Sequence, residues 1–128
     1  MIYGTGIDLV HVPRVAGVYE RHGERFVDRL LHDAERREFE ALSLPRRRVL
    51  YLAKAFAVKE AFVKAMGTGF RGIAHDHVGA VRSESGRPSL IYVAALSRQL
   101  ESLGIIGAHV SISDEHEFAL ASVTLETA

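Results

Sequence analysis

VLYLAKAFAVKEAFVKAMG, from Val49 to Gly67, is the longest helical pattern in the chain and is apolar on nearly every side. The basic run Arg46–Arg48 opens this pattern and Gly67 provides a C-terminal stop, so we expect one helix that ends at Met66. A helix that is apolar all round is usually buried. Its only charged side chains after the basic run are Lys54, Lys59, Glu60 and Lys64. Because buried charges need partners, these four are the first side chains to consider for function.

The segments before this helix predict one strand and several short helices. Ile2–Val10 is rich in β-forming residues and predicts a strand. The period of two places on one face of that strand Gly4, Gly6, Asp8 and Val10. We expect a first helix over Pro13–Arg21 and a second, short helical piece that holds Phe26, Leu30 and Leu31. A third helix is predicted from an N-cap at Asp33, with Glu35 in its first turn, to about Ser43–Pro45.

The segments after the long helix are mostly strands. Strands are predicted over His77–Arg82, Ser89–Val93, Gly107–Ser113 and Ala119–Leu125, with a helix over Ala94–Leu103. Ser83–Pro88 reads as a turn, and Asp114–Glu117 as the joint of a hairpin. The sequence therefore predicts an α+β fold, in which a helical first half with one long buried helix packs on an antiparallel sheet.

Composition excludes several classes of protein. The chain has 128 residues, which fits a single domain over residues 1–128. Its 16 Lys and Arg balance 16 Asp and Glu, which argues against nonspecific nucleic-acid binding. Cysteine is absent, so a disulfide scaffold, a thiolate nucleophile and a Cys-ligated metal are excluded. No segment has the length of a membrane span and no signal peptide is evident, so we expect a soluble, cytoplasmic protein.

Two carboxylates stand in apolar elements and invite two interpretations each. Glu60 and Lys64 share a helix face, so they form either an ordinary i,i+4 ion pair or an acidic ligand beside a phosphate-binding cation. Asp8 is either a strand end or helix cap, or a ligand inside a packed strand. Magnesium would explain the two acids together, since it is held by one or two carboxylates, waters and substrate phosphates.

Other candidate motifs are weaker. Gly67-Thr68-Gly69 is either an ordinary helix end or a loop that lets the backbone approach a ligand closely. The seven histidines show no metal-ligand spacing, and neither a nucleophile elbow nor a phosphate-binding P-loop is present. His109 and His116 are most simply surface or sheet residues.

Four segments together resemble one family. Gly6–Val10 resembles its G-[IVT]-D strand, and Phe56–Gly69 closely resembles its F-A-x-K-E-A-x-x-K-A-x-G-T-G signature. Gly86–Pro88 resembles its G-[KR]-P turn, and His109–Ser113 its H-V-S-[IL] strand. The family is holo-[acyl-carrier-protein] synthase, the small bacterial class of 4′-phosphopantetheinyl transferases. The similarity runs from Met1 to near the C-terminus, and the central signature is its most specific part.

The resemblance implies a reaction and a set of site residues. Coenzyme A would donate its 4′-phosphopantetheine arm to a serine of apo acyl carrier protein, leaving adenosine 3′,5′-bisphosphate. Asp8 and Glu60 match the family's Mg²⁺ ligands, and Lys64 matches its lysine near the phosphates. Glu60 is the candidate to take the serine proton, directly or through a water on the metal. The implied catalytic residues are thus Glu60, Lys64 and Asp8; the implied coenzyme A contacts are Lys64, Lys54, Gly67, Thr68, Gly69, Arg87 and Pro88.

The resemblance also implies partners. The family forms homotrimers with active sites between subunits, and its first helix contacts the acyl carrier protein. Arg14 falls on the matching position of that helix and Arg21 lies near it, although a solvated helix face would also explain both.

Two positions depart from the family pattern and support a rival interpretation. Ala55 replaces a common arginine, for which Lys54 is the nearest substitute, and Asp114 replaces a common histidine. Asp114 is therefore an additional candidate site residue, acting through the water shell of the metal, or it is not critical. The rival function is a noncatalytic trimeric module that binds coenzyme A or carrier protein. A nucleic-acid binder using Arg46–Arg48 is the third hypothesis, and the zero net charge argues against it.

Overall fold

The computed structural model describes residues 1–128, which form five strands, five α-helices and one short 3₁₀ turn. In chain order these elements are β1 (Ile2–His11), α1 (Val12–His22), α2 (Glu24–Leu30), α3 (Asp33–Glu40), α4 (Pro45–Met66), η1 (His75–His77), β2 (Val78–Arg82), β3 (Pro88–Tyr92), α5 (Ala94–Ser102), β4 (Ile105–Glu115) and β5 (Phe118–Thr127). None of the helices combines the length and apolar character needed to cross a membrane.

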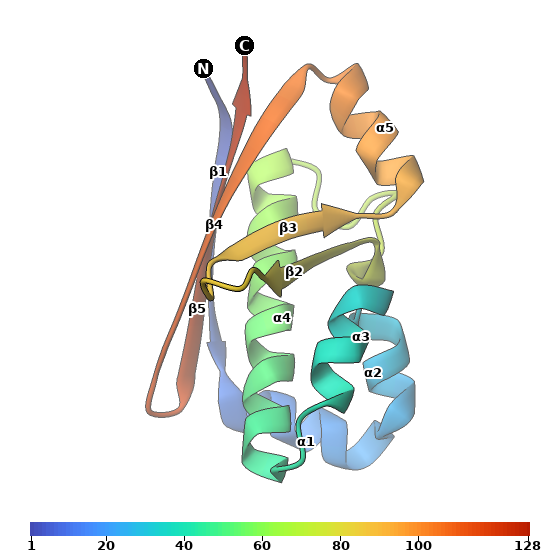
Figure 1. Cartoon of the computed structure of the whole chain (residues 1–128), viewed down its shortest axis with the longest axis vertical. Coiled ribbons are helices and arrows are strands. Elements are labelled where there is room, and N and C mark those ends of the chain that lie inside the picture. Colours follow the sequence, from blue (N-terminus) through green and yellow to red (C-terminus); the bar gives the residue numbers. More distant parts are fainter.

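The strands form two separate antiparallel sheets. The larger sheet has the order β1-β5-β4, so the last strand of the chain pairs with the first. The smaller sheet is the hairpin of β2 and β3. All helices and the β2–β3 hairpin lie on one side of the three-stranded sheet, and no element covers the other side (Figure 1). The predicted α+β fold, with helices on an antiparallel sheet, is confirmed.

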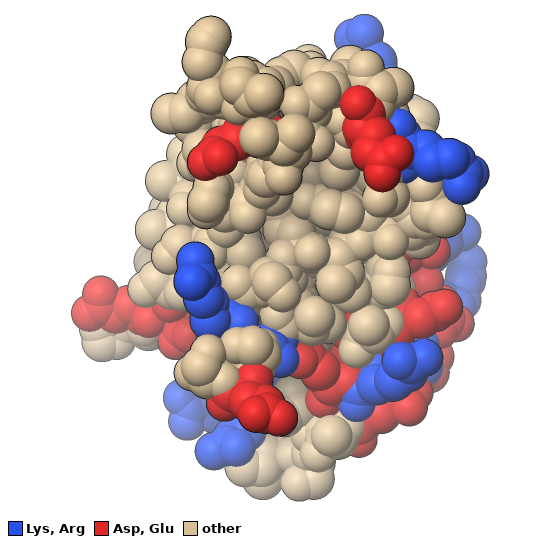
Figure 2. All heavy atoms as spheres, turned by 45° about the horizontal axis from the view of Figure 1, so that its top comes forward, with Lys and Arg blue, Asp and Glu red and all other residues tan.

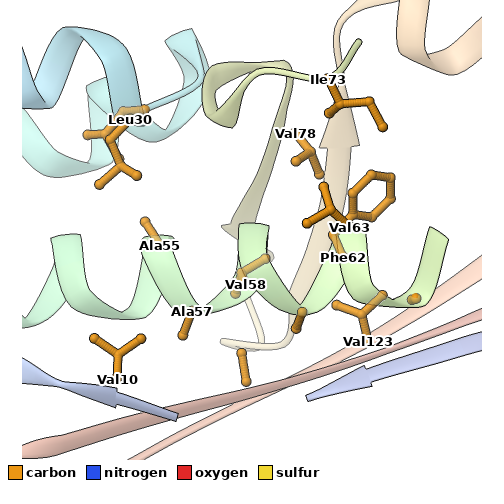
Figure 3. Packing of buried hydrophobic residues seen from close by; sticks show 14 of the residues in the cluster. Val10, Leu30, Ala55, Ala57, Val58, Phe62, Val63, Ile73, Val78 and Val123 are labelled. Atoms are coloured by element: carbon orange, nitrogen blue, oxygen red, sulfur yellow. The ribbon is translucent and has the colours of Figure 1, made fainter. Parts of the chain in front are cut away.

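Helix α4 is the centre of the core. Its side chains meet the three-stranded sheet on one face and α2, η1 and β2 on the other, as Val10 and Val123 on one side and Leu30 and Val78 on the other illustrate (Figure 3). Eleven of its residues are buried, which agrees with the prediction that this helix is enclosed. The alternation of β5 completes the packing, because Ala119, Ala121, Val123 and Leu125 all face inward.

Two glycines let β1 lie directly against the backbone of α4. A Cβ atom on Gly4 would stand 2.0 Å from the carbonyl oxygen of Ala65, and one on Gly6 would stand 1.9 Å from that of Ala61. Both separations are far below van der Waals contact, so no side chain fits at either position. The close approach brings the next inward position of the strand, Asp8, beside the same helix.

The structure differs from the sequence prediction at several boundaries. Helix α3 ends at Glu40, before the expected Ser43–Pro45, and Asp114 and Glu115 belong to β4 rather than to the turn. The prediction of Asp33 as N-cap is wrong, because the cap is His32. Its Nδ1 accepts a hydrogen bond from the Ala34 N–H, and Glu35 accepts one from the N–H of His32. A histidine can supply the same acceptor as the usual capping side chains.

Candidate active site

Asp8 lies on the face of β1 that meets α4. Strand alternation sets it two residues beyond Gly6, which contacts the helix backbone. Asp8 pairs with Ala121 of β5 in the sheet, so the sheet fixes its backbone on one side and α4 covers the other. Its side chain is mostly shielded from solvent. The interpretation of Asp8 as a strand end or a helix cap does not describe this position.

Lys64 reaches from α4 to Asp8. Its Nζ donates to Asp8 Oδ1 at 3.0 Å and to the carbonyl oxygen of Ile7 at 3.0 Å. Side chains on a helix lean toward its N-terminus, which explains how Lys64 meets a strand residue beyond the level of Gly6. Lys64 makes no ion pair with Glu60, so the simple i,i+4 pair is not what the structure contains.

Glu60 completes this group one helical turn before Lys64. Burial raises the pKa of the Glu60 carboxyl, the negative charge of Asp8 raises it further, and the positive charge of Lys64 lowers it. Asp8 and Glu60, far apart in sequence, are therefore near enough in space for one charge to disfavour the other. The structure brings together the three residues that the sequence analysis singled out for catalysis.

The donor set of this site fits Mg²⁺. Two carboxylates lie in the same region beside solvent, and the repulsion that the charge of Asp8 exerts on Glu60 is what a bound cation relieves. No group of three or more His, Asp or Glu side chains with metal-binding geometry occurs in the structure. Mg²⁺ needs no such group, because waters and substrate phosphates supply its remaining ligands.

An aromatic group that the sequence analysis did not identify borders Glu60. The ring of His75 lies between Phe56 and Phe70, with centroid distances of 5.7 Å and 3.9 Å and near-parallel planes. His75 Nε2 lies 3.8 Å from Glu60 Oε1. Burial lowers the pKa of the His75 ring, and the positive charge of Lys59 lowers it further. No spacing in the sequence signals this contact, because His75 reaches Glu60 only through the irregular segment after α4.

A second group of the expected residues lies elsewhere on α4. Lys54 Nζ pairs with Asp114 Oδ2 at 2.7 Å, so Asp114 neutralises the charge of the lysine that stands next to Ala55. Lys54 and Glu60 point about 120° apart around the helix axis. Beside Lys54 is a cavity of about 280 Å³ whose lining includes Pro88, two further cations, Arg47 and Arg82, and the carboxylates of Glu35 and Glu38. Neither of these arginines was among the sequence-based candidates for coenzyme A binding.

The remaining candidates are exposed. Gly67 ends α4 in the left-handed conformation, with φ of 79°, and Gly67, Thr68 and Gly69 form an open loop beyond it. Arg87 lies in the exposed turn between β2 and β3. Arg14 and Arg21 are exposed on α1 and have no ion-pair partner. Seven positions apart, they share one helix face.

The neighbour of Glu60 in the signature, Lys59, has a different role. It is completely buried and donates to Glu35 Oε1 at 2.6 Å and to the carbonyl oxygen of Val78. The other oxygen of Glu35 accepts from the N–H of Ala80. Burial lowers the pKa of the Lys59 amine and the Glu35 carboxylate opposes that effect. This pair joins α3, α4 and β2, and Glu35 also contributes to the wall of the cavity beside Lys54.

Known proteins share both the sequence and the fold. The profile of the 4′-phosphopantetheinyl transferase superfamily matches residues 4–121. The chain is 41% identical over 127 residues to the holo-[acyl-carrier-protein] synthase of Neisseria meningitidis serogroup A, covering 98% of this chain and 99% of that protein. The holo-[acyl-carrier-protein] synthase of Pectobacterium carotovorum is 40% identical, with 98% of each chain covered.

Solved structures share the fold of this chain. The crystal structure of holo-[acyl-carrier-protein] synthase from Neisseria meningitidis superposes with a TM-score of 0.93 at 41% identity, covering 99% of this chain and 100% of that chain. The Bacillus anthracis holo-(acyl-carrier-protein) synthase, in complex with CoA (3′,5′-ADP), gives a TM-score of 0.82 at 32% identity, covering 100% and 99%. The chain therefore belongs to the 4′-phosphopantetheinyl transferase superfamily and, within it, to the holo-[acyl-carrier-protein] synthase family.

Proposed function

We propose that this chain transfers the 4′-phosphopantetheine arm of coenzyme A to a serine of apo acyl carrier protein. In this reaction the serine oxygen forms a bond to the pantetheine-bearing phosphorus. The bond from that phosphorus to the oxygen that bridges to the nucleotide breaks, and adenosine 3′,5′-bisphosphate leaves. The observation that carries the proposal is the meeting of Asp8, Glu60 and Lys64 at the contact of β1 and α4.

Asp8 and Glu60 would hold the Mg²⁺ ion. When bound, the ion supplies positive charge that offsets the charge developing on the pyrophosphate as the nucleotide leaves. Lys64 is placed to contact the same phosphates, since its ammonium already lies at the carboxylate of Asp8. Glu60 lies at the same junction, and a carboxylate is a common general base. Glu60 is our candidate for the group that takes the serine proton, directly or through a water on the metal.

The nucleotide end of coenzyme A needs a cationic site, and the cavity beside Lys54 is our candidate. Arg47, Lys54 and Arg82 line it, and Pro88 forms part of its wall. Arg47 has no ion-pair partner and is free to meet a phosphate, whereas Lys54 is shared with Asp114. Arg47 would thus supply the charge that Ala55 lacks. Arg87 and the loop Gly67–Gly69 remain proposed contacts.

We further propose that the active site is completed between subunits of a homotrimer. The carboxylate site and the cavity beside Lys54 lie on different faces of α4 within one chain, and in a trimer a neighbouring copy would place its cavity beside the carboxylate site. The uncovered face of the large sheet offers the contact surface, because Ile7 is 60% exposed and Leu9 is 63% exposed there. Figure 2 adds a broad area without charged side chains at the end of the molecule that holds both termini.

Acyl carrier protein would dock on α1. Arg14 and Arg21 lie on one exposed face of this helix without partners, so both guanidinium groups are free for an acidic protein surface. The helix follows β1 directly, and its position relative to Asp8 is therefore fixed by the chain itself.

The test is a mass measurement. The purified chain is mixed with coenzyme A, Mg²⁺ and apo acyl carrier protein, and the carrier protein is weighed by mass spectrometry. We expect the mass to rise by one phosphopantetheine arm, and the rise to disappear with Asp8→Asn, Glu60→Gln or a chelator. Binding of coenzyme A or carrier protein without any mass gain, insensitive to chelator, would instead favour the noncatalytic module.

A further inference from the structure

One buried polar atom of the structure lacks a partner, and it belongs to the edge of the site. His75 Nε2 is the only buried side-chain nitrogen or oxygen without a hydrogen bond. Buried polar atoms are nearly always paired, so each exception calls for an explanation. Leaving such a group unpaired is unfavourable, and a purely apolar residue in the same aromatic stack would avoid this cost.

The surroundings of His75 restrict what that atom can meet. The rings of Phe70 and Phe56 both stack on the His75 ring, with centroid distances of 3.9 Å and 5.7 Å, and this packing restricts its rotation. Its Nε2 faces Glu60 Oε1 at 3.8 Å, slightly beyond hydrogen-bond distance. The other charges that act on the ring are those of Lys59 and Asp76. A small rotation of the Glu60 side chain would bring its oxygen to Nε2.

We propose that His75 is a positioning residue for Glu60, whose Nε2–H donates a hydrogen bond to one carboxylate oxygen and leaves the other oxygen for the divalent cation shared with Asp8. This inference rests on the proposed function. Carboxylates that hold a metal are commonly fixed by such a second hydrogen bond, and losing it typically costs about 10–100-fold in metal affinity. The aromatic rings of Phe56 and Phe70 orient the donor, so the arrangement is stiff before any ligand binds.

Two substitutions at one position separate hydrogen bonding from packing. His75→Phe keeps an aromatic ring between Phe56 and Phe70 but removes the donor. His75→Gln removes the ring but places an amide N–H near the position of Nε2. Mn²⁺ alone is the probe, and its affinity for the full chain is measured by electron paramagnetic resonance, without turnover. His22→Phe, at the exposed end of α1, is the matched control, and thermal unfolding shows whether each variant is folded.

We expect His75→Phe to weaken Mn²⁺ binding by about 10-fold or more, while His75→Gln and His22→Phe stay near the wild-type affinity. If His75→Phe binds Mn²⁺ as well as the wild type, or if only His75→Gln loses binding, His75 is a packing residue and the inference is wrong. Glu60→Gln distinguishes this failure from a failure of the proposed site. If the wild type binds no Mn²⁺, or if Glu60→Gln binds it unchanged, both the proposed metal site and the proposed role of His75 are wrong.

Discussion

The surroundings of Glu60 lower the stability of the folded chain but favour a role of this side chain in the reaction. Its carboxyl is partly buried, and the charge of Asp8 raises its pKa together with that burial, while Lys64 only partly compensates. In a folded chain without a cation, the charge of Asp8 therefore disfavours the ionised form of Glu60. Such local instability is common at functional sites, where removing the group improves folding and abolishes activity.

Replacing Glu60 should stabilise the metal-free protein in a pH-dependent way. Because the folded pKa of Glu60 lies above its ordinary value of 4.5, the folded protein keeps a proton that the unfolded chain releases in the window between them. The free energy of unfolding of the wild type consequently falls as pH rises through this window. Glu60→Gln does not titrate, so its advantage over the wild type should grow with pH and then level off.

Urea unfolding in the presence of a chelator, from about pH 4 to pH 7, measures this difference. Glu84→Gln, in the exposed turn between β2 and β3, is a suitable control and should follow the wild type. A difference between Glu60→Gln and the wild type that shrinks as pH rises would show that the Glu60 charge is favoured rather than disfavoured in the fold.

At the residue scale, the sequence identifies charged side chains in otherwise apolar elements, but it does not identify their partners. Asp8, Glu60 and Lys64 were found because charged side chains are unusual in such apolar elements. The partner of buried Lys59 is Glu35, 24 positions away on another helix, and only the packing of α3 on α4 brings them together. His75 was missed for the same reason, since its contact with Glu60 depends on an irregular loop.

At the scale of elements, the contact of β1 with α4 sets the geometry of the site. A Cβ on Gly6 would stand 1.9 Å from the Ala61 carbonyl oxygen. Gly6→Ala must push strand and helix apart, and we expect a loss of about 1–3 kcal/mol or more in the free energy of unfolding. The same displacement would separate Asp8 from Lys64 and lower activity. Urea unfolding and the transfer assay measure the two effects.

The matched control is Gly17→Ala within α1. A Cβ at Gly17 meets only the flexible end of Arg21, at 3.4 Å. The alanine should therefore gain its helix propensity, about 1 kcal/mol. If Gly6→Ala behaves like Gly17→Ala, the tight contact between β1 and α4 does not exist.

The buried pair of Lys59 and Glu35 connects α4 to α3 and β2. Glu35→Gln leaves the Lys59 ammonium buried without a counter-charge, and we expect it to cost about 3–5 kcal/mol of unfolding free energy. Glu38→Gln, one turn further along α3, keeps one acceptor oxygen for the two hydrogen bonds that Glu38 accepts from the Tyr51 hydroxyl and the Arg82 N–H, and should cost only about 1 kcal/mol. Chemical denaturation of both variants makes the comparison. Equal losses would mean that the ionic character of the buried pair is unimportant.

The pattern of elements was largely predictable, and their arrangement was not. Hydrophobic periodicity located the long helix to Met66 and each strand to within a few residues. The cap of α3 was misassigned because histidine is an uncommon capping residue, yet His32 fills that position. Strand order is known only from the structure, because no local sequence pattern predicts that β5 pairs with β1 as well as with β4.

At the scale of the whole molecule, one face of the large sheet has nothing packed on it (Figure 1). Ile7 is 60% exposed and Leu9 is 63% exposed there, and exposed apolar side chains on an uncovered face are typical of an interaction site. We expect light scattering to give three times the chain mass of 14.1 kDa, and Leu9→Lys to reduce it to a single chain. Leu44→Lys, at a leucine before α4 that is 55% exposed, should leave the mass unchanged. A wild-type protein with the mass of a single chain would show that the trimer proposal is wrong.

The proposed chemistry depends on a single Mg²⁺ ion held between Asp8 and Glu60. A crystal grown with coenzyme A and Mn²⁺ allows the metal to be located by its anomalous scattering. We predict one strong peak within coordination distance of the carboxylates of both Asp8 and Glu60 and in contact with the pyrophosphate. Coenzyme A bound with its pyrophosphate away from these carboxylates, or a metal peak that touches neither of them, would contradict the account.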